Sequence, residues 1–404
     1  MLSVYAILAA LAVTFPGHFS AEIGSNCNLP FKPVPYGFFA PLIYGADEKF
    51  SEASTNESTV LEPQESVTLS CEPGYFKSYP KTRTLKAKCI GGEELQLEDG
   101  SKELWSKNFA CDLRPVEEVL TPNLPGCPPE AEGTEFGYIN PFTKKSIIIG
   151  EACYNVTKGQ IIFVHAKTHP GLKIEDQNYL QRGSHPESRN KLEFFKALRY
   201  DAIYDRFKNV FGPPEKVLRI IYRSLLTAQM LSLPQLHLVN RLTWNYAISH
   251  DDESLAGWTA LRDGVEKFTA ENAAADVWIG TSGVAKVVDV AGTAWDFYLQ
   301  HPKFPVPKYH WIIVKVNNKA TGFLFYNIPP FLNTRSYGNE EPKILEKICQ
   351  RKCKEFSWLE GVEGIRCCSV EEMRQVIPEI PPISGVLGEL PPKQEAPQGE
   401  SMIS

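Results

Sequence analysis

The chain of 404 residues lacks an apolar run long enough to cross a bilayer as a helix, which would need about 20 residues. It has no Cys-x-x-Cys pair of the kind that ligates structural zinc, and it shows no internal repeat. Positive charge is not in excess, because 42 Lys and Arg are set against 48 Asp and Glu, for a net charge of -6. These absences argue against a membrane protein, a structural zinc protein, a repeat protein and a protein that attracts nucleic acid through its overall charge.

The amino-terminal segment predicts export. Residues 4–15 form a continuous apolar run that is followed by a Pro-Gly turn and two small residues. This pattern is typical of a secretory signal peptide, which we expect over residues 1–21. Two Asn-x-Ser/Thr sequons, at Asn56 and Asn155, predict glycosylation of an exported chain.

The cysteines predict a disulfide framework, because they fall into two clusters of even number. The pairing stays open at this point. The clusters are Cys27, Cys71, Cys89, Cys111, Cys127 and Cys153, then Cys349, Cys353, Cys367 and Cys368.

Three parts are expected after the signal peptide. Residues 22–156 are rich in Pro, Gly and Ser, and their alternating stretches at 66–71 and 83–89 are typical of strands. They predict a small disulfide-stapled β module. Residues 157–376 predict an α+β domain, and the Pro- and Glu-rich residues 377–404 predict a disordered tail. In the α+β domain we expect helices over 188–211 and 255–270, and strands over 160–166, 277–280, 297–299, 310–316 and 320–326.

Segments of the second domain resemble a known family. Residues 305–311 (PVPKYHW) are similar to a Pro-x-Pro-Lys-Tyr-x-Trp strand entry, and residues 323–329 (FLFYNIP) to an aromatic-x-Asn-x-Pro strand. Residues 277–284 (VWIGTSGV) and the carboxy-terminal cysteine cluster fit the same order. The family is the DNA/RNA non-specific endonucleases, or ββα-metal nucleases, in their arthropod secreted branch. The resemblance implies a ββα-metal nuclease-like domain with a central antiparallel sheet and flanking helices.

In that family a histidine general base activates water, while Mg²⁺, held by an Asn, stabilises the charge that develops on phosphate. The family's Arg-Gly-His aligns with Arg223-Ser224-Leu225, so Leu225 stands at the position of the base. Leucine cannot accept a proton. The resemblance therefore implies that no catalytic residue is intact, unless His237 or His250 substitutes.

The metal asparagine of the family best matches Asn245, although this residue could equally be a strand asparagine without a metal role. In the helix that follows, the family's Glu and Arg are replaced by Arg262 and Glu266. An arginine at this place would repel Mg²⁺ and attract phosphate. Alternatively, the two residues only exchange the ends of an i,i+4 ion pair.

Residues 182–241, which correspond to one wall of the family's substrate cleft, contain eleven Lys or Arg and five Asp or Glu. The local charge of about +6 predicts phosphate binding that is independent of base sequence. The alternative is a solvated helix face. The candidate phosphate-binding residues are Arg199, Arg219, Arg223, Arg241 and Arg262.

The sequence thus favours a secreted protein that binds double-stranded DNA, and possibly RNA, through phosphates, needs no cofactor and has little or no hydrolytic activity. Secretion in saliva is implied by similarity to the tsetse salivary-gland nuclease-like proteins. One alternative is a weak Mg²⁺-dependent DNA/RNA endonuclease with a displaced base. Another is a binder of a different host ligand on the same scaffold. Oligomeric state, the preference for DNA or RNA and the role of the first module stay open.

Overall fold

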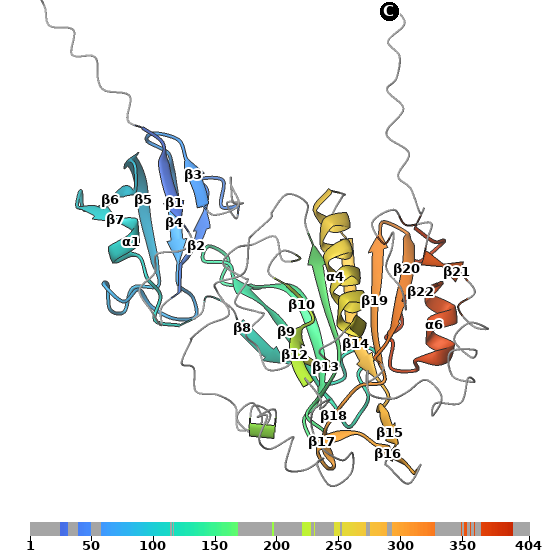
Figure 1. The fold of residues 1–404 in the computed structure, drawn as a ribbon. Coiled ribbons are helices and arrows are strands. Elements are labelled where there is room, and N and C mark those ends of the chain that lie inside the picture. The colour runs from blue at the N-terminus through green and yellow to red at the C-terminus, as the bar shows by residue number, and fades with distance from the viewer. Residues whose placement is uncertain are drawn as a thin grey trace, which may run out of the picture.

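The computed structural model of the chain is mostly strand with few helices, and all ten cysteines are joined in five disulfides. Two strand-rich parts follow one another along the chain (Figure 1). The structure describes residues 25–30, 39–49, 58–113, 115, 117–168, 196–197, 220–227, 230, 246–250, 253–271, 275–288, 293–327, 349, 351–353, 356, 359 and 365–390. The expected signal peptide, residues 1–21, and the sequon at Asn56 lie outside this range.

The first part is a five-stranded antiparallel sheet that packs its apolar face against a short helix and a strand pair. Two disulfides, Cys27–Cys89 and Cys71–Cys111, close its core. The strands expected at 66–71 and 83–89 are confirmed as β4 and β5. In sheet order the strands are β2 (Leu42–Tyr44), β4 (Ser66–Ser70), β5 (Thr84–Gly91), β6 (Glu94–Leu97) and β7 (Lys102–Leu104); beside them lie β1 (Cys27–Pro30) paired with β3 (Ser58–Leu61), and α1 (Trp105–Asn108).

The second part is a nine-stranded antiparallel sheet, as expected for its centre. Its disulfides are Cys127–Cys153, Cys349–Cys368 and Cys353–Cys367. In sheet order the strands are β21 (Arg351–Lys352), β22 (Ile365–Cys368), β20 (Lys319–Tyr326), β19 (Tyr309–Val316), β14 (Ala275–Ser282), β11 (Gln160–Thr168), β10 (Ser146–Asn155), β9 (Glu132–Ile139) and β8 (Glu117–Leu120).

This topology corrects the expected boundary of the first module. Residues 117–155 form β8, β9 and β10 and pair with β11 in the large sheet, so the expected module of residues 22–156 spans parts of both sheets. The two sheets divide the chain between Cys111 and Glu117. The expectation was wrong because short alternating strands look the same in sequence whichever sheet they join.

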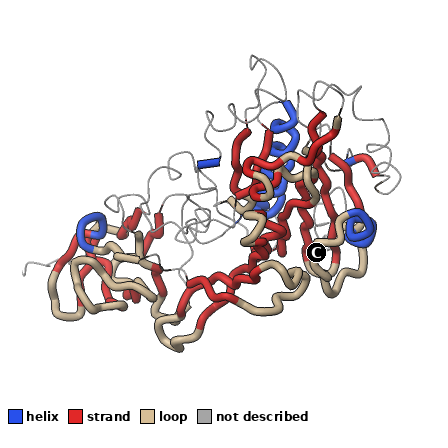
Figure 2. The backbone as a smooth tube through the Cα atoms, turned by 90° about the horizontal axis from the view of Figure 1, so that it is seen from below, coloured by secondary structure: helices blue, strands red, loops and turns tan. Residues whose placement is uncertain are grey.

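Each face of the large sheet has its own cover (Figures 1 and 2). One face packs against α4 (Glu253–Glu271) and the strand pair β12 (Ile220–Ser224) and β13 (Tyr246–His250). The opposite face packs against α6 (Val370–Val376) and the segment that follows it. Two small hairpin pairs lie at one end: β15 (Lys286–Val288) with β16 (Ala294–Asp296), and β17 (Tyr298–Gln300) with β18 (Lys303–Pro305).

The helix expected over 255–270 is confirmed as α4. Of the helix expected over 188–211, only Lys196 and Ala197 are described, and both are helical. The rest of that prediction lies outside the described residues. The strands expected in the second domain are all found, with bounds that differ by a few residues.

The tail is ordered further than expected. Ile377 and Ile380 are buried against the face covered by α6, and Leu390 is buried in the cluster on the α4 face. The backbone of Leu390 donates a hydrogen bond to Thr321 Oγ1 at 3.1 Å. The expectation of disorder over 377–404 is therefore wrong for residues 377–390. Apolar side chains spaced among the prolines provide enough buried surface to dock an extended chain. Residues 391–404 lie outside the described range.

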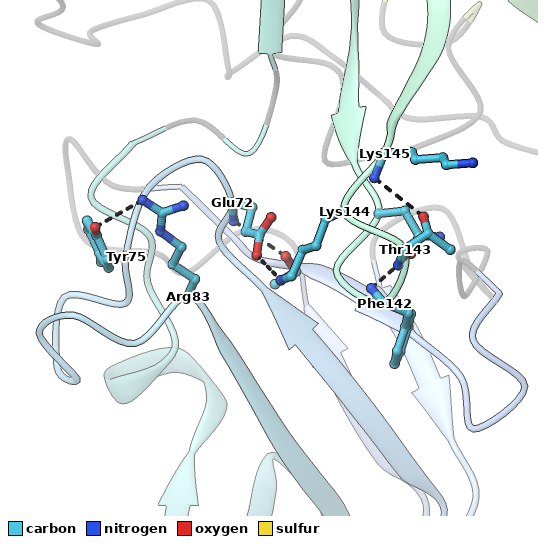
Figure 3. Close-up of polar contacts among 9 residues, drawn as sticks. Glu72, Tyr75, Arg83, Phe142, Thr143, Lys144 and Lys145 are labelled. Atoms are coloured by element: carbon cyan, nitrogen blue, oxygen red, sulfur yellow. Dashed lines mark hydrogen bonds and ion pairs between the residues drawn. The ribbon is translucent and has the colours of Figure 1, made fainter.

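The two sheets meet at the loop between β9 and β10. Tyr44 of the first sheet packs against Tyr138 and against Phe142 of this loop, with ring centroids 6.5 and 5.8 Å apart. Nearby, Lys144 forms an ion pair with Glu72, whose side chain is only 4% exposed (Figure 3). The contact between the two sheets therefore combines an aromatic cluster with a buried carboxylate, Glu72, whose charge is balanced by Lys144.

Candidate functional site

The segment that contains Leu225 folds as strand, strand and helix. β12 and β13 pair antiparallel, with Arg223 opposite Ala247, and α4 begins soon after β13 ends (Figure 1). In α4, Trp258, Leu261 and Val265 recur at three- to four-residue spacing, which places them on one buried face of the helix. The helix is thereby held against β14, β19 and β20 in the middle of the sheet.

Leu225 lies directly after β12 and is fully buried, with an exposed fraction of 0%. It belongs to one hydrophobic cluster with Ala247, Trp258 and Leu261. Its side chain cannot accept a proton, and it is shielded from solvent. Leu225 is therefore a packed core residue, and its correspondence to the family's general base stays a prediction.

Arg262 lies one turn beyond Trp258 on α4 and is only 18% exposed. Its Nε is 3.7 Å from Oε1 of Glu266, and its Nη2 is 3.4 Å from Oδ1 of Asp263. Arg262 was expected either to attract phosphate or to form an i,i+4 ion pair with Glu266, and the structure shows the ion pair. Two neighbouring carboxylates therefore compete with any phosphate for this guanidinium group.

His310 and Asn327, which the sequence motifs contain but which were not predicted as site residues, form hydrogen bonds to the backbone of β13. His310 of β19 is completely buried, its ring centroid is 4.8 Å from that of Trp258, and its ring bonds to the backbone of Ile248. Burial lowers the pKa of His310 to about 3, although the bond to Ile248 acts in the opposite direction. Asn327 is 2% exposed; its Nδ2 donates to the carbonyl oxygens of Pro307 at 2.8 Å and Ile248 at 3.5 Å.

The described side chains around Leu225 do not fit a magnesium ion. Mg²⁺ prefers oxygen ligands, whereas the described residues that cluster with Leu225 are apolar. Within the described ranges, no group of three or more His, Cys, Asp or Glu could hold a metal ion.

The remaining predicted site residues are not placed. Asn245, Arg199, Arg219, Arg241 and His237 lie outside the described residues. For Arg223 and His250 the strand pairing is described but the side chain is not. The structure therefore describes the side chains of only two predicted site residues: Leu225, which packs against α4, and Arg262, which lies on that helix.

A second polar cluster lies on three neighbouring strands. Nε2 of His165 is 3.2 Å from Oδ1 of Asp276, its Nδ1 is 3.5 Å from Oε2 of Glu151, and its ring stacks on Trp278 with centroids 4.3 Å apart. Burial alone would lower the pKa of His165, but the bonds to Asp276 and Glu151 outweigh it and raise the pKa. Because Trp278 packs into the face covered by α6, this histidine lies on the opposite side of the sheet from Leu225 and is no displaced base for it.

The sequon asparagine Asn155 is buried and held in a turn. The Asn155 side chain is 4% exposed, and its Oδ1 accepts a hydrogen bond from the backbone of Lys158 at 2.8 Å. A glycan attached to Asn155 would require this turn to open, because its side chain is buried. The prediction of glycosylation at Asn155 therefore does not fit the fold.

No protein-family model matches the chain, and no curated protein matches its sequence. Among solved structures, the chain is similar to one in "Crystal structure of the EndoG/EndoGI complex: Mechanism of EndoG inhibition", with a TM-score of 0.30 and 14% sequence identity. The similarity covers 50% of this chain and 82% of that chain. The match is weak, and a TM-score of 0.30 carries no argument about activity.

The cysteines and helices bear on the compartment. Five disulfides are typical of proteins that fold in an oxidising environment. None of the helices within the described part of the chain is long and apolar enough to cross a membrane.

Proposed function

We propose that the chain is a secreted, sequence-nonspecific nucleic-acid-binding protein, built on the scaffold of a DNA/RNA non-specific endonuclease that has lost its chemistry. The observation that carries the proposal is the burial of Leu225 at the position of the general base, within a strand–strand–helix unit. The family motifs support it, because residues 277–284, 305–311 and 323–329 contribute to three adjacent strands under that unit.

Hydrolysis would lack both of its protein-derived requirements. A general base typically contributes on the order of 10²–10⁴ in rate, and Leu225 supplies none. The position from which the family orients metal-bound water holds Arg262, which pairs with Glu266. We therefore expect Mg²⁺ to have little effect on this protein's interaction with DNA.

Binding would rest on the basic segment at residues 182–241, whose excess of about six positive charges is local to this part of a net-negative chain. Of the five arginines proposed for phosphate, Arg262 is the weakest, because Asp263 and Glu266 already neutralise it. Arg199, Arg219, Arg223 and Arg241 carry the proposal. Such contacts release counterions, so the affinity should fall steeply with salt.

The test is a titration of a labelled DNA duplex with the full-length mature protein, in Mg²⁺ and in EDTA, at several salt concentrations, with the DNA checked on a gel afterwards. The proposal expects salt-sensitive binding that EDTA does not change, and intact DNA. The double variant Arg219→Gln/Arg223→Gln should weaken binding and reduce the salt slope by about 2. The matched control Lys102→Gln/Lys107→Gln removes two charges from the first domain and should leave the slope unchanged.

Two outcomes would refute the proposal in different ways. Rapid Mg²⁺-dependent cleavage would show that a base other than residue 225 is at work. Absence of binding at low salt in both buffers would remove nucleic acid from the function altogether.

A further inference from the structure

A pocket of about 500 Å³ opens where the first sheet meets the loop between β9 and β10. Its floor is the outer face of β4, β5 and β6, and one wall is Phe142. Its volume lies within the range of small-molecule sites, which is roughly 300–1,000 Å³, and such sites favour domain boundaries. The pocket lies between the first sheet and the β9–β10 loop, apart from the strand–strand–helix unit, so its function goes beyond the nucleic-acid binding proposed above.

The floor is polar because of strand register. Ser66, Lys88 and Gln96 are direct cross-strand neighbours, and Thr68 is opposite Lys86. These side chains share one face of the sheet, while the residues between them point into the core. Hydroxyl, amide and ammonium groups therefore lie side by side on a flat surface and offer both donors and acceptors.

The charges lining the pocket cancel. Nζ of Lys86 is 3.4 Å from Oε1 of Glu98, and the other two ionisable residues that line it, Lys88 and Glu48, have opposite signs. A site for phosphate or sulfate would need an excess of positive charge. The balance instead favours a neutral ligand that can donate and accept hydrogen bonds at several points.

The wall is apolar and fixed in place. Phe142 packs edge-on against Tyr44, with interplanar angle 85°. Its loop is held by Oδ1 of Asn140, which accepts hydrogen bonds from the backbones of Phe142 and Thr143 at 2.9 and 3.0 Å (Figure 3). A rigid aromatic ring beside a polar floor suits a ligand with one apolar face and several hydroxyls.

We propose that this pocket binds a saccharide, with the C–H face of a sugar ring against Phe142 and its hydroxyls on the hydroxyl, amide and ammonium groups of β4, β5 and β6. A pyranose combines these features: each hydroxyl both donates and accepts, the ring carries no charge, and its axial C–H groups form an apolar face. Because the floor and the wall come from different sheets, a bound sugar would also bridge the two domains.

The experiment is saturation-transfer NMR on the full-length protein, with maltose, lactose and chitobiose as separate probes. Binding of at least one probe with saturable transfer is the expected result. Phe142→Leu keeps an apolar side chain against Tyr44 but removes the aromatic face, and should weaken that binding about fivefold. Thr68→Val, which replaces a pocket hydroxyl with a methyl group, should weaken it by a similar factor.

The matched control is Thr84→Val, which makes the same exchange on the same face of the first sheet but outside the pocket lining. It should bind as the unchanged protein does. The proposal is overturned if none of the three sugars gives saturable transfer, if Thr84→Val weakens binding as much as Thr68→Val, or if inorganic phosphate displaces the sugar, which would identify an anion site. DNA binding is measured separately on the same variants, so failure of one proposal leaves the other open to its own test.

Discussion

The burial of His310 makes a quantitative prediction about acid stability. The pKa of this histidine is 6.5 in an exposed reference state and about 3 in the folded protein. Between these values the unfolded chain binds a proton that the folded chain does not, so lowering the pH favours unfolding. At pH 4.5, two units below the reference pKa, the cost is about 3 kcal/mol relative to neutral pH.

The variant His310→Gln isolates this contribution from the carboxylates that also titrate in acid. Glutamine keeps an amide that can bond to the backbone of Ile248, but it cannot take up the proton. The free energy of unfolding is measured with urea at pH 7 and pH 4.5, followed by tryptophan fluorescence. The loss between the two pH values should be smaller in the variant than in the unchanged protein by about 3 kcal/mol.

Only the pH-dependent difference is compared, so a general loss of stability in the variant does not obscure the result. His301→Gln is the control, because His301 is an exposed histidine in the turn between β17 and β18. If His310→Gln and the unchanged protein lose equal stability between pH 7 and pH 4.5, His310 is not held neutral in the core and the reasoning fails.

Three further predictions concern single contacts. Lys144→Met removes the ion-pair partner of the buried Glu72 carboxylate and should cost about 1–2 kcal/mol, less than for a fully buried pair because Lys144 is 60% exposed; a urea midpoint equal to that of Lys145→Met would contradict this. Leu225→His should lower stability by roughly 3 kcal/mol and generate no Mg²⁺-dependent cleavage, because the imidazole would enter a closed apolar cluster; a plasmid-nicking assay checks it, and new cleavage would refute it. Asn155 should stay unmodified when the protein is expressed through a glycosylating secretory pathway, and a glycopeptide at this site in mass spectrometry would show that the Asn155 side chain is not held in the buried turn.

Much of the second domain could be predicted from local periodicity. The spacing of Trp258, Leu261 and Val265 predicts α4, and apolar strands predict β11, β14, β19 and β20, because these patterns determine which faces are buried. Within α4, the Arg262–Glu266 pair follows from helix geometry alone, since residues four apart are neighbours.

Long-range partners could not be predicted in the same way. Six cysteines before residue 154 suggested one module, yet Cys127–Cys153 belongs to the second sheet, and only the other four close the first core. The spacing of the cysteines along the sequence does not indicate which of them belong to which sheet. Likewise, nothing in the alternation of β19 distinguishes a buried histidine from an exposed one; His310 is buried because α4 places Trp258 over it.

If the junction around Leu225 is a degenerate nuclease centre, as proposed, its packing explains why introducing a histidine there should not create catalysis. Leu225 contributes to a closed cluster, Arg262 is engaged by Glu266, and His310 is held neutral beneath Trp258. Among the described residues, each of these groups is either apolar or already has a partner, so a base introduced at residue 225 would lie in an apolar cluster. With Arg262 engaged by Glu266, the proposed phosphate contacts are those of the basic segment, which includes Arg223 of β12. The basic segment at residues 182–241 is therefore the part of the chain on which the proposed binding depends, and its charge, rather than the junction, is what variants should alter first.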